Sequence, residues 1–227
     1  MAEKLSKQDL EGPDAFQSAI ELISDYIAEN KKRFYSIVTA IVLAAGIAFG
    51  IYMYWSHYQY SAKDLYAKAQ DIQTAQVPEN PESITQKIKI YEELIDKYPH
   101  SWSARMAYYH LGNIYYNRGE FDKAIDDYKK FVSSRISDKA GIKFLALTSI
   151  GYSYESKKDY KAALEYFQKA LKSNNAGFES VAYSNIARIY ELMNNKKNAL
   201  DNYKLALEKS MDSSKSVFIK YKISSLI

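Results

Sequence analysis

Histidines and carboxylates are the side chains of this sequence that could carry out acid–base catalysis or bind a metal ion. Three histidines occur: His57, His100 and His110. Their spacing matches no metal-binding motif. Adjacent acids such as Glu92-Glu93 and Asp126-Asp127 are typical of solvated helix faces. The sequence contains no phosphate-binding glycine loop, no Gly-x-Ser-x-Gly motif and no His-Glu-x-x-His motif. We therefore expect no enzyme, no cofactor and no metal site.

Cysteine content and charge narrow the function classes further. The chain has 227 residues and no Cys, which excludes disulfides, thiolate metal sites and Cys nucleophiles. The net charge of +4 is uneven, because residues 1–33 carry five basic and seven acidic side chains whereas the rest has a net charge of +6. This excess is scattered and forms no long basic run, so we expect no nucleic-acid partner. An ordinary solvated surface and an attraction to anionic lipid headgroups or an acidic partner both remain open.

The chain is organised around one uncharged segment, residues 34–55. This segment contains no Asp, Glu, Lys, Arg or His. As a helix rising about 1.5 Å per residue it would span roughly 33 Å, close to the ~30 Å hydrocarbon core of a bilayer. Aromatic side chains gather at both ends, as they do at headgroup level. A buried core helix would rarely be apolar on every face, and a cleaved signal peptide has a shorter apolar core and a small-residue cleavage site. We interpret the segment as an uncleaved transmembrane helix in membrane lipid.

Basic residues predict the orientation of this helix. Lys31, Lys32 and Arg33 directly precede it, whereas Lys63 and Lys68 are the basic residues within about 20 residues after it. The short N-terminal tail should therefore stay in the cytoplasm, and the larger C-terminal part should cross the membrane.

Small side chains line two faces of the predicted transmembrane helix. Gly46 and Gly50 form a GxxxG pair. A second row of small residues at four-residue spacing consists of Ser36, Ala40, Ala44 and Ala48. Small residues let helix backbones approach closely in lipid. We expect a partner helix here, either a second copy of the chain, giving a homo-oligomer, or another membrane protein.

The cytoplasmic tail, residues 1–33, is predicted to contain a short amphipathic helix. One apolar stripe at helical spacing is formed by Phe16, Ala19, Ile20, Ile23 and Ile27. The polar side of this helix is acidic, which disfavours an anionic membrane surface. A helix that docks on a protein partner and a simple extension of the transmembrane helix are both open.

Beyond residue 100 one residue pattern occurs three times. Each copy has an aliphatic residue followed at offsets 1, 4, 13 and 17 by a small residue, Tyr, Ala and an aromatic residue. The copies begin at Leu111, Ile150 and Ile186, 39 and 36 residues apart, close to the period of about 34 residues of helix–turn–helix repeats. The small residues suit the point where two antiparallel helices cross, and stacked neighbours complete each pair's core. The pattern predicts an all-α fold.

Three stretches resemble tetratricopeptide repeats: YYHLGNIYYNRGEFDKAIDDY, SIGYSYESKKDYKAALEYFQKAL and YSNIARIYELMNNKKNALDNYKLAL. The resemblance implies a TPR-type α-solenoid of antiparallel helix pairs over residues 56–227. It would comprise a degenerate unit at 60–100 with helices at 60–75 and 83–98, repeats at about 104–137, 143–176 and 179–211, and a C-terminal capping helix at 213–227. The chain departs from the family pattern where Ala187 replaces a helix Gly and where Lys158 and Asn194 replace the turn Gly.

In tetratricopeptide repeats the first helix of each pair lines a concave groove, and the family's register then gives the groove positions of this chain. These are Tyr109, Asn113, Tyr116, Asn117, Thr148, Tyr152, Glu155, Ser156, Ser184, Arg188 and Glu191. Tyr combines apolar area with a hydroxyl, which suits an extended peptide or a partner helix. The alternative is that these residues are ordinary surface polar groups.

The whole layout resembles a narrower family, the bacterial YfgM-like ancillary subunits of the SecYEG translocon. This resemblance implies a single-pass inner-membrane protein whose repeats face the periplasm, near the Sec translocon and periplasmic chaperones or clients. We therefore expect a membrane-anchored protein–protein interaction scaffold, chaperone-like in role, that acts in protein translocation or envelope protein assembly. Three alternatives remain: a structural subunit of another large membrane complex whose repeats pack on neighbouring subunits, a receptor with cytoplasmic repeats, and a hydrolase or lipid-active enzyme.

Overall fold

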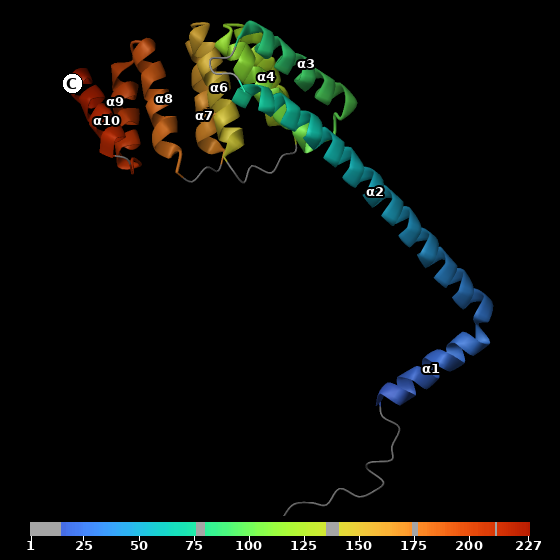
Figure 1. Cartoon of the computed structure of the whole chain (residues 1–227). Coiled ribbons are helices and arrows are strands. Elements are labelled where there is room, and N and C mark those ends of the chain that lie inside the picture. The colour runs from blue at the N-terminus through green and yellow to red at the C-terminus, as the bar shows by residue number, and fades with distance from the viewer. Residues whose placement is uncertain (1–14, 76–79, 135–140, 174–176, 212) are drawn as a thin grey trace, which may run out of the picture. The chain divides into compact units, whose positions relative to one another are not determined.

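The computed structural model describes residues 15–75, 80–134, 141–173, 177–211 and 213–227. Within these ranges the chain forms ten helices and no strand (Figure 1), so the all-α prediction is confirmed. The chain divides into two compact units, Met1–His57 and Tyr58–Ile227. The part of the predicted tail before residue 15 lies outside the described residues.

The first unit contains α1 (Ala15–Glu29) and the beginning of α2 (Lys31–Ala75). The predicted apolar stripe of α1 includes Ile20 and Ile23, and both side chains are exposed. Asn30 separates the two helices, so the tail helix is a separate element from α2.

α2 is a single helix that covers both the predicted transmembrane segment and the predicted helix at 60–75. The sequence has no Gly or Pro between residues 51 and 77, so nothing interrupts the helix between the two segments. By length and composition alone, Lys31–Ile72 could cross a membrane. Its apolar side chains are exposed, for example Ile41 and Leu43.

The second unit consists of the end of α2 and eight further helices. They are α3 (Pro81–Lys97), α4 (Trp102–Asn117), α5 (Phe121–Ser133), α6 (Ile142–Ser156), α7 (Tyr160–Lys172), α8 (Glu179–Leu192), α9 (Lys196–Glu208) and α10 (Ser213–Leu226). From α3 onward each helix packs against the next one in the sequence, and Figure 1 draws α6 to α10 as a row of neighbouring helices. This is the predicted solenoid of helix pairs with a C-terminal capping helix.

Glycines at the helix crossings allow close packing within a pair. A Cβ atom added to Gly112 would lie 2.6 Å from the Tyr128 ring, and one added to Gly151 would lie 2.6 Å from the Phe167 ring. Both rings are buried, so they have no free space into which they could retreat. In the third pair Ala187 occupies the corresponding place in a cluster with Tyr203.

The turns inside the three pairs share one backbone geometry. The residue at the left-handed position is Gly119, Lys158 or Asn194, with φ values of 75°, 61° and 57°. The residue after it donates its N–H to the carbonyl of the helix Tyr five residues earlier, at 2.8–2.9 Å in all three turns. Left-handed backbone favours Gly and tolerates Asn, so Lys158 holds the strained position of the three.

α10 packs on α8 and α9 through one side only. Ile219, Ile223 and Leu226 contact the cluster that contains Ala187 and Tyr203. Three other apolar residues of the helix, Val217, Phe218 and Tyr221, are exposed.

Candidate functional site

Five of the predicted groove residues line one hollow in the second unit. Its volume is about 550 Å³, and its lining comes from α4, α6 and α8 together with the turn and start of α7. The lining residues are Tyr116, Tyr152, Glu155, Ser156, Lys158, Tyr160, Asn185, Arg188 and Leu192. The first helices of three successive pairs therefore contribute to the lining of one hollow; that this hollow binds a ligand stays a prediction.

A polar network crosses the floor of this hollow from α6 to α8. The Tyr152 hydroxyl donates to Asn185 Oδ1 at 3.0 Å, and Arg188 Nη2 donates to the same oxygen at 3.3 Å. Arg188 also forms an ion pair with Glu155, and its guanidinium carbon lies 5.4 Å from the centre of the Tyr152 ring. These contacts fix the side chains in place before any ligand arrives, which lowers the entropy cost of binding.

Asn185 leaves one donor of this network unused. A guanidinium can only donate, so the Asn185 atom that faces Arg188 is the carbonyl oxygen. The amide nitrogen, Nδ2, is buried and has no hydrogen-bond partner among the described residues. An unsatisfied buried donor is costly, so an acceptor supplied by a ligand would relieve a cost that the free protein carries.

Asn185 is not among the predicted groove residues, although it lies one residue after the predicted Ser184. The family register counts fixed positions on each first helix, and residue 185 is not among them. Its neighbours Ile186 and Ala187 belong to the repeat pattern, so position alone marked Asn185 as flanking the core. Only the side-chain contacts reveal that its amide reaches the hollow.

Two other predicted groove residues, Tyr109 and Asn113, contact a side chain of the second helix of their own pair. Asn113 accepts a hydrogen bond from the Tyr128 hydroxyl at 2.7 Å, and Tyr109 packs on the Tyr128 ring. Burial raises the pKa of Tyr128 well above its usual value, with the nearby Ser149 opposing it. Both predicted residues thus join the helices of their own pair.

Four further predicted groove residues lie on α4, α6 and α8 but do not line the hollow. Thr148 is buried, and its Oγ1 has no partner among the described residues. Glu191 accepts hydrogen bonds from Tyr203 at 2.5 Å and from Lys222 at 3.1 Å. Ser184 lines a separate hollow beside α10, and Asn117 is exposed.

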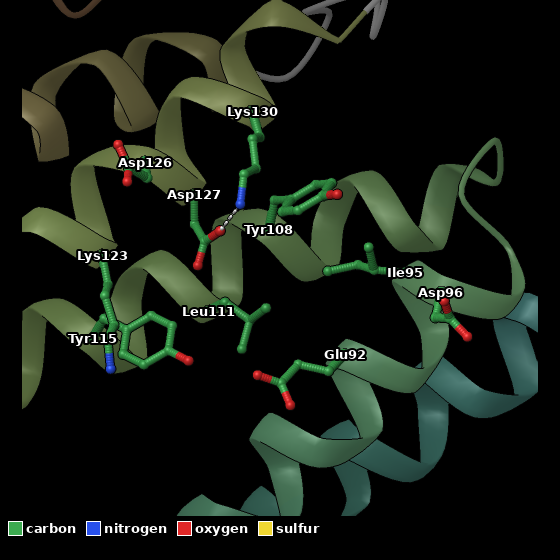
Figure 2. A pocket seen from close by; sticks show the side chains of 10 residues that line it. All are labelled: Glu92, Ile95, Asp96, Tyr108, Leu111, Tyr115, Lys123, Asp126, Asp127 and Lys130. Carbon is green, nitrogen blue, oxygen red and sulfur yellow. Dashed lines mark hydrogen bonds and ion pairs between the residues drawn. The ribbon is translucent and has the colours of Figure 1, made fainter.

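A second hollow of about 400 Å³ lies among α3, α4 and α5, and Figure 2 shows its charged lining. Asp127 is buried there, which raises the pKa of its carboxyl, and Lys130 donates to it at 3.1 Å. Lys123 lies 5.1 Å from the centre of the Tyr115 ring. None of the predicted groove residues lines this hollow, so we keep the groove across α4, α6 and α8 as the candidate site.

Of the three histidines, only His110 lies in a packed environment. Its Nε2 is 2.6 Å from the Tyr66 hydroxyl, and its ring stacks on that of Tyr91. Burial, with a smaller effect of Lys87, lowers the pKa of His110 to about 4. Among the described residues no group of three His, Cys, Asp or Glu side chains is placed to bind a metal ion. His110 of α4 therefore packs between α2 and α3.

The small residues of the predicted transmembrane helix are open to contact. A Cβ atom added to Gly46 or Gly50 would meet nothing within 4 Å. Ala40, Ala44 and Ala48 are exposed as well. A partner helix at this face stays a prediction.

Comparisons with known proteins agree with this architecture. The sequence profile of the family described as tetratricopeptide repeat-like domain matches residues 31–227. A comparison with curated proteins gives no match. Among solved structures, the chain resembles MamA from Desulfovibrio magneticus RS-1 with 16% identity and a TM-score of 0.52, over 67% of this chain and 78% of that one. It resembles pilF of Pseudomonas aeruginosa with 14% identity and a TM-score of 0.55, over 73% and 68%. It also resembles the apo form of RapI with 15% identity and a TM-score of 0.60, over 73% and 62%. These similarities show the fold.

Proposed function

The chain belongs to the tetratricopeptide repeat-like domain family, and from this premise we propose that it is a membrane-anchored scaffold that binds other proteins through the groove across α4, α6 and α8. The observation that carries the proposal is the pre-arranged network of Tyr152, Asn185 and Arg188 on the floor of a hollow lined by three first helices. Its tyrosines offer apolar area, and its amides and charges offer hydrogen bonds, which is the composition expected of a protein-binding surface.

The ligand that fits this groove best is an extended peptide segment. The free Nδ2 donor of Asn185 needs an acceptor, and a peptide supplies a carbonyl oxygen at every residue. The Glu155–Arg188 ion pair occupies the guanidinium, so this cation is not an isolated charge that awaits a free carboxylate.

Site-specific photo-cross-linking in cells tests the groove. A photoreactive amino acid at Ser156, which is exposed and lines the hollow, should capture partner proteins. The matched control is Lys161, which is exposed on α7 and absent from the lining. Adding Asn185→Leu to the Ser156 probe should reduce capture several-fold. Equal capture at both positions, or capture unaffected by Asn185→Leu, would contradict the groove and favour a structural subunit whose repeats pack elsewhere on neighbouring proteins.

We propose further that residues 34–55 of α2 cross the bacterial inner membrane once, with the tail of residues 1–33 in the cytoplasm and the repeats in the periplasm. The exposed apolar side chains of this segment and the three preceding basic residues support this arrangement. Protease treatment of sealed inner-membrane vesicles of each orientation is the test. The repeats should be degraded only where the periplasmic face is outside, and the opposite pattern would support a receptor with cytoplasmic repeats.

The cellular setting we propose is protein translocation or envelope protein assembly, with the Sec translocon and periplasmic chaperones or clients as the partners. The support is the family resemblance of the whole layout together with the open small-residue face at Gly46 and Gly50. Purification in mild detergent, followed by identification of co-purifying membrane proteins, tests this setting. In a Gly46→Ile/Gly50→Ile variant a partner helix packed on this face should be lost, and retention of every partner would contradict that part of the proposal.

A further inference from the structure

The last helix of the solenoid exposes an apolar stripe. Val217, Phe218 and Tyr221 are 68%, 57% and 68% exposed. They are three or four residues apart around Tyr221 and so share one face of α10. The other side of the helix, with Ile219 and Ile223, packs on α8 and α9. The helix is thus apolar on two sides, although only one of them is used inside the unit.

A helix of a repeat array whose outer face meets only water normally carries polar side chains on that face. The outer face of α10 instead offers the kind of surface that each preceding helix presents to the next one. We propose that this face is a docking surface for an amphipathic helix of a partner protein, with acidic residues flanking the apolar stripe of that helix. The inference does not depend on the groove proposed above.

A hollow beside the stripe could receive a side chain of a bound helix. It has a volume of about 390 Å³ and lies between α8 and α10. Val181 and Ser184 line it from α8, and Phe218 and Ile219 line it from α10. Phe218 belongs both to the stripe and to this hollow, so an apolar side chain of a bound helix can enter the hollow while its neighbours cover the stripe. Central apolar anchors of this kind carry most of the binding energy of helix-in-groove complexes.

Charge selects the kind of partner. α10 carries three lysines and no acid. By helical spacing, Lys220 flanks the stripe beside Val217, and Lys215 and Lys222 flank it beside Phe218. Lys222 also reaches Glu191 of α8 at 3.1 Å. A second copy docked through the same face would bring lysines against lysines, which is unfavourable, whereas a helix with Glu or Asp along its stripe would be attracted.

Two synthetic peptides of about 18 residues test the proposal. Both carry a Leu stripe at helical spacing; one has Glu at the flanking positions and the other has Lys. Binding to the full chain in nanodiscs of zwitterionic lipid is measured by fluorescence anisotropy, with empty nanodiscs as background. We expect the Glu peptide to bind about tenfold more tightly than the Lys peptide at low salt, and the difference to narrow as salt screens the charges. Lys220→Glu should reduce this preference.

Variants of the face separate docking from nonspecific adsorption. A Val217→Asp/Phe218→Asp variant should weaken Glu-peptide binding about tenfold or more, since it places charges within the stripe. Leu205→Asp is the matched control, because Leu205 is an exposed apolar residue of α9, outside the stripe. Equal affinity for the two peptides, or affinity unchanged in the double variant, would overturn the proposal. So would a concentration-dependent dimer that the double variant abolishes, because it would assign the face to a second copy of this chain.

Discussion

A Gly151→Ala substitution sets two effects of known sign against each other. In an open helix position Ala favours the helix over Gly by about 1 kcal/mol, so the variant would be more stable. At Gly151 the added Cβ would lie 2.6, 2.8 and 2.9 Å from Cε1, Cδ1 and Cζ of Phe167, whereas ordinary contacts lie at 3.4–4 Å. The Phe167 side chain is 0% exposed, so it cannot swing into solvent.

The structure predicts that the cost of steric crowding against Phe167 exceeds the gain in helix preference. Forcing one extra methyl group into a well-packed core costs about 1–3 kcal/mol. After the helix preference is subtracted, we expect Gly151→Ala to lower the free energy of unfolding by about 1 kcal/mol. Phe167→Leu, which makes room, should relieve the clash, so the double variant should be more stable than the sum of the two single effects predicts by the crowding cost, about 1–3 kcal/mol.

Urea unfolding of the full chain in mild detergent, followed by far-UV circular dichroism, measures these free energies. Ser156→Ala is the control on the same helix, because Ser156 is exposed and its replacement should change stability by less than about 0.5 kcal/mol. A Gly151→Ala protein more stable than the parent, or strictly additive effects in the double variant, would show that the crossing is not as close as described.

Three further predictions concern residues with unusual environments. Below pH 6.5 an unfolded His110 binds a proton, whereas the folded one, with its pKa lowered to about 4, does not. The free energy of unfolding should therefore be highest above pH 6.5 and should fall by about 3 kcal/mol in all as the pH falls to about 4. Urea midpoints measured across this range should fall in the parent protein and should fall less in His110→Gln. Thr148→Val removes a buried hydroxyl without a described partner. It should raise the free energy of unfolding by about 1 kcal/mol, measured as a higher urea midpoint. A lower midpoint would show that the hydroxyl has a hydrogen-bond partner. Lys158→Gly relieves a left-handed backbone with φ of 61° and should raise the thermal midpoint by the equivalent of about 1 kcal/mol, while Lys157→Gly, at a helical C-cap, should not.

The repeat pattern predicted the helix pairs because packing dictates its residue types. Small residues recur where helices cross, and Gly112 and Gly151 meet buried rings at those crossings. The turns have a different cause. Each of them needs one residue with a left-handed backbone conformation, which favours Gly or Asn at that position. Lys158 shows that the backbone geometry persists where the residue preference is broken, because the packed helices on both sides impose it.

Side-chain contacts between helices were less accessible to sequence reasoning. Counting positions along a helix selects a face but does not say which polar atoms meet across it, so Asn185 was missed although it links Tyr152 to Arg188. The capping helix has apolar residues on two sides, and the pattern could not decide whether Phe218 or Ile219 faces the core. The structure buries Ile219.

The most extensive helix contacts of the second unit join neighbours in the sequence, and this has a consequence for how the chain reaches its native state. Proteins dominated by short-range contacts fold within microseconds to milliseconds, whereas synthesis adds only about 5–20 residues per second. Each helix pair can therefore acquire its core as soon as the next helix emerges from a ribosome or a membrane channel. The contacts that join every second helix, such as Tyr66 of α2 with His110 of α4, follow once one more helix has emerged.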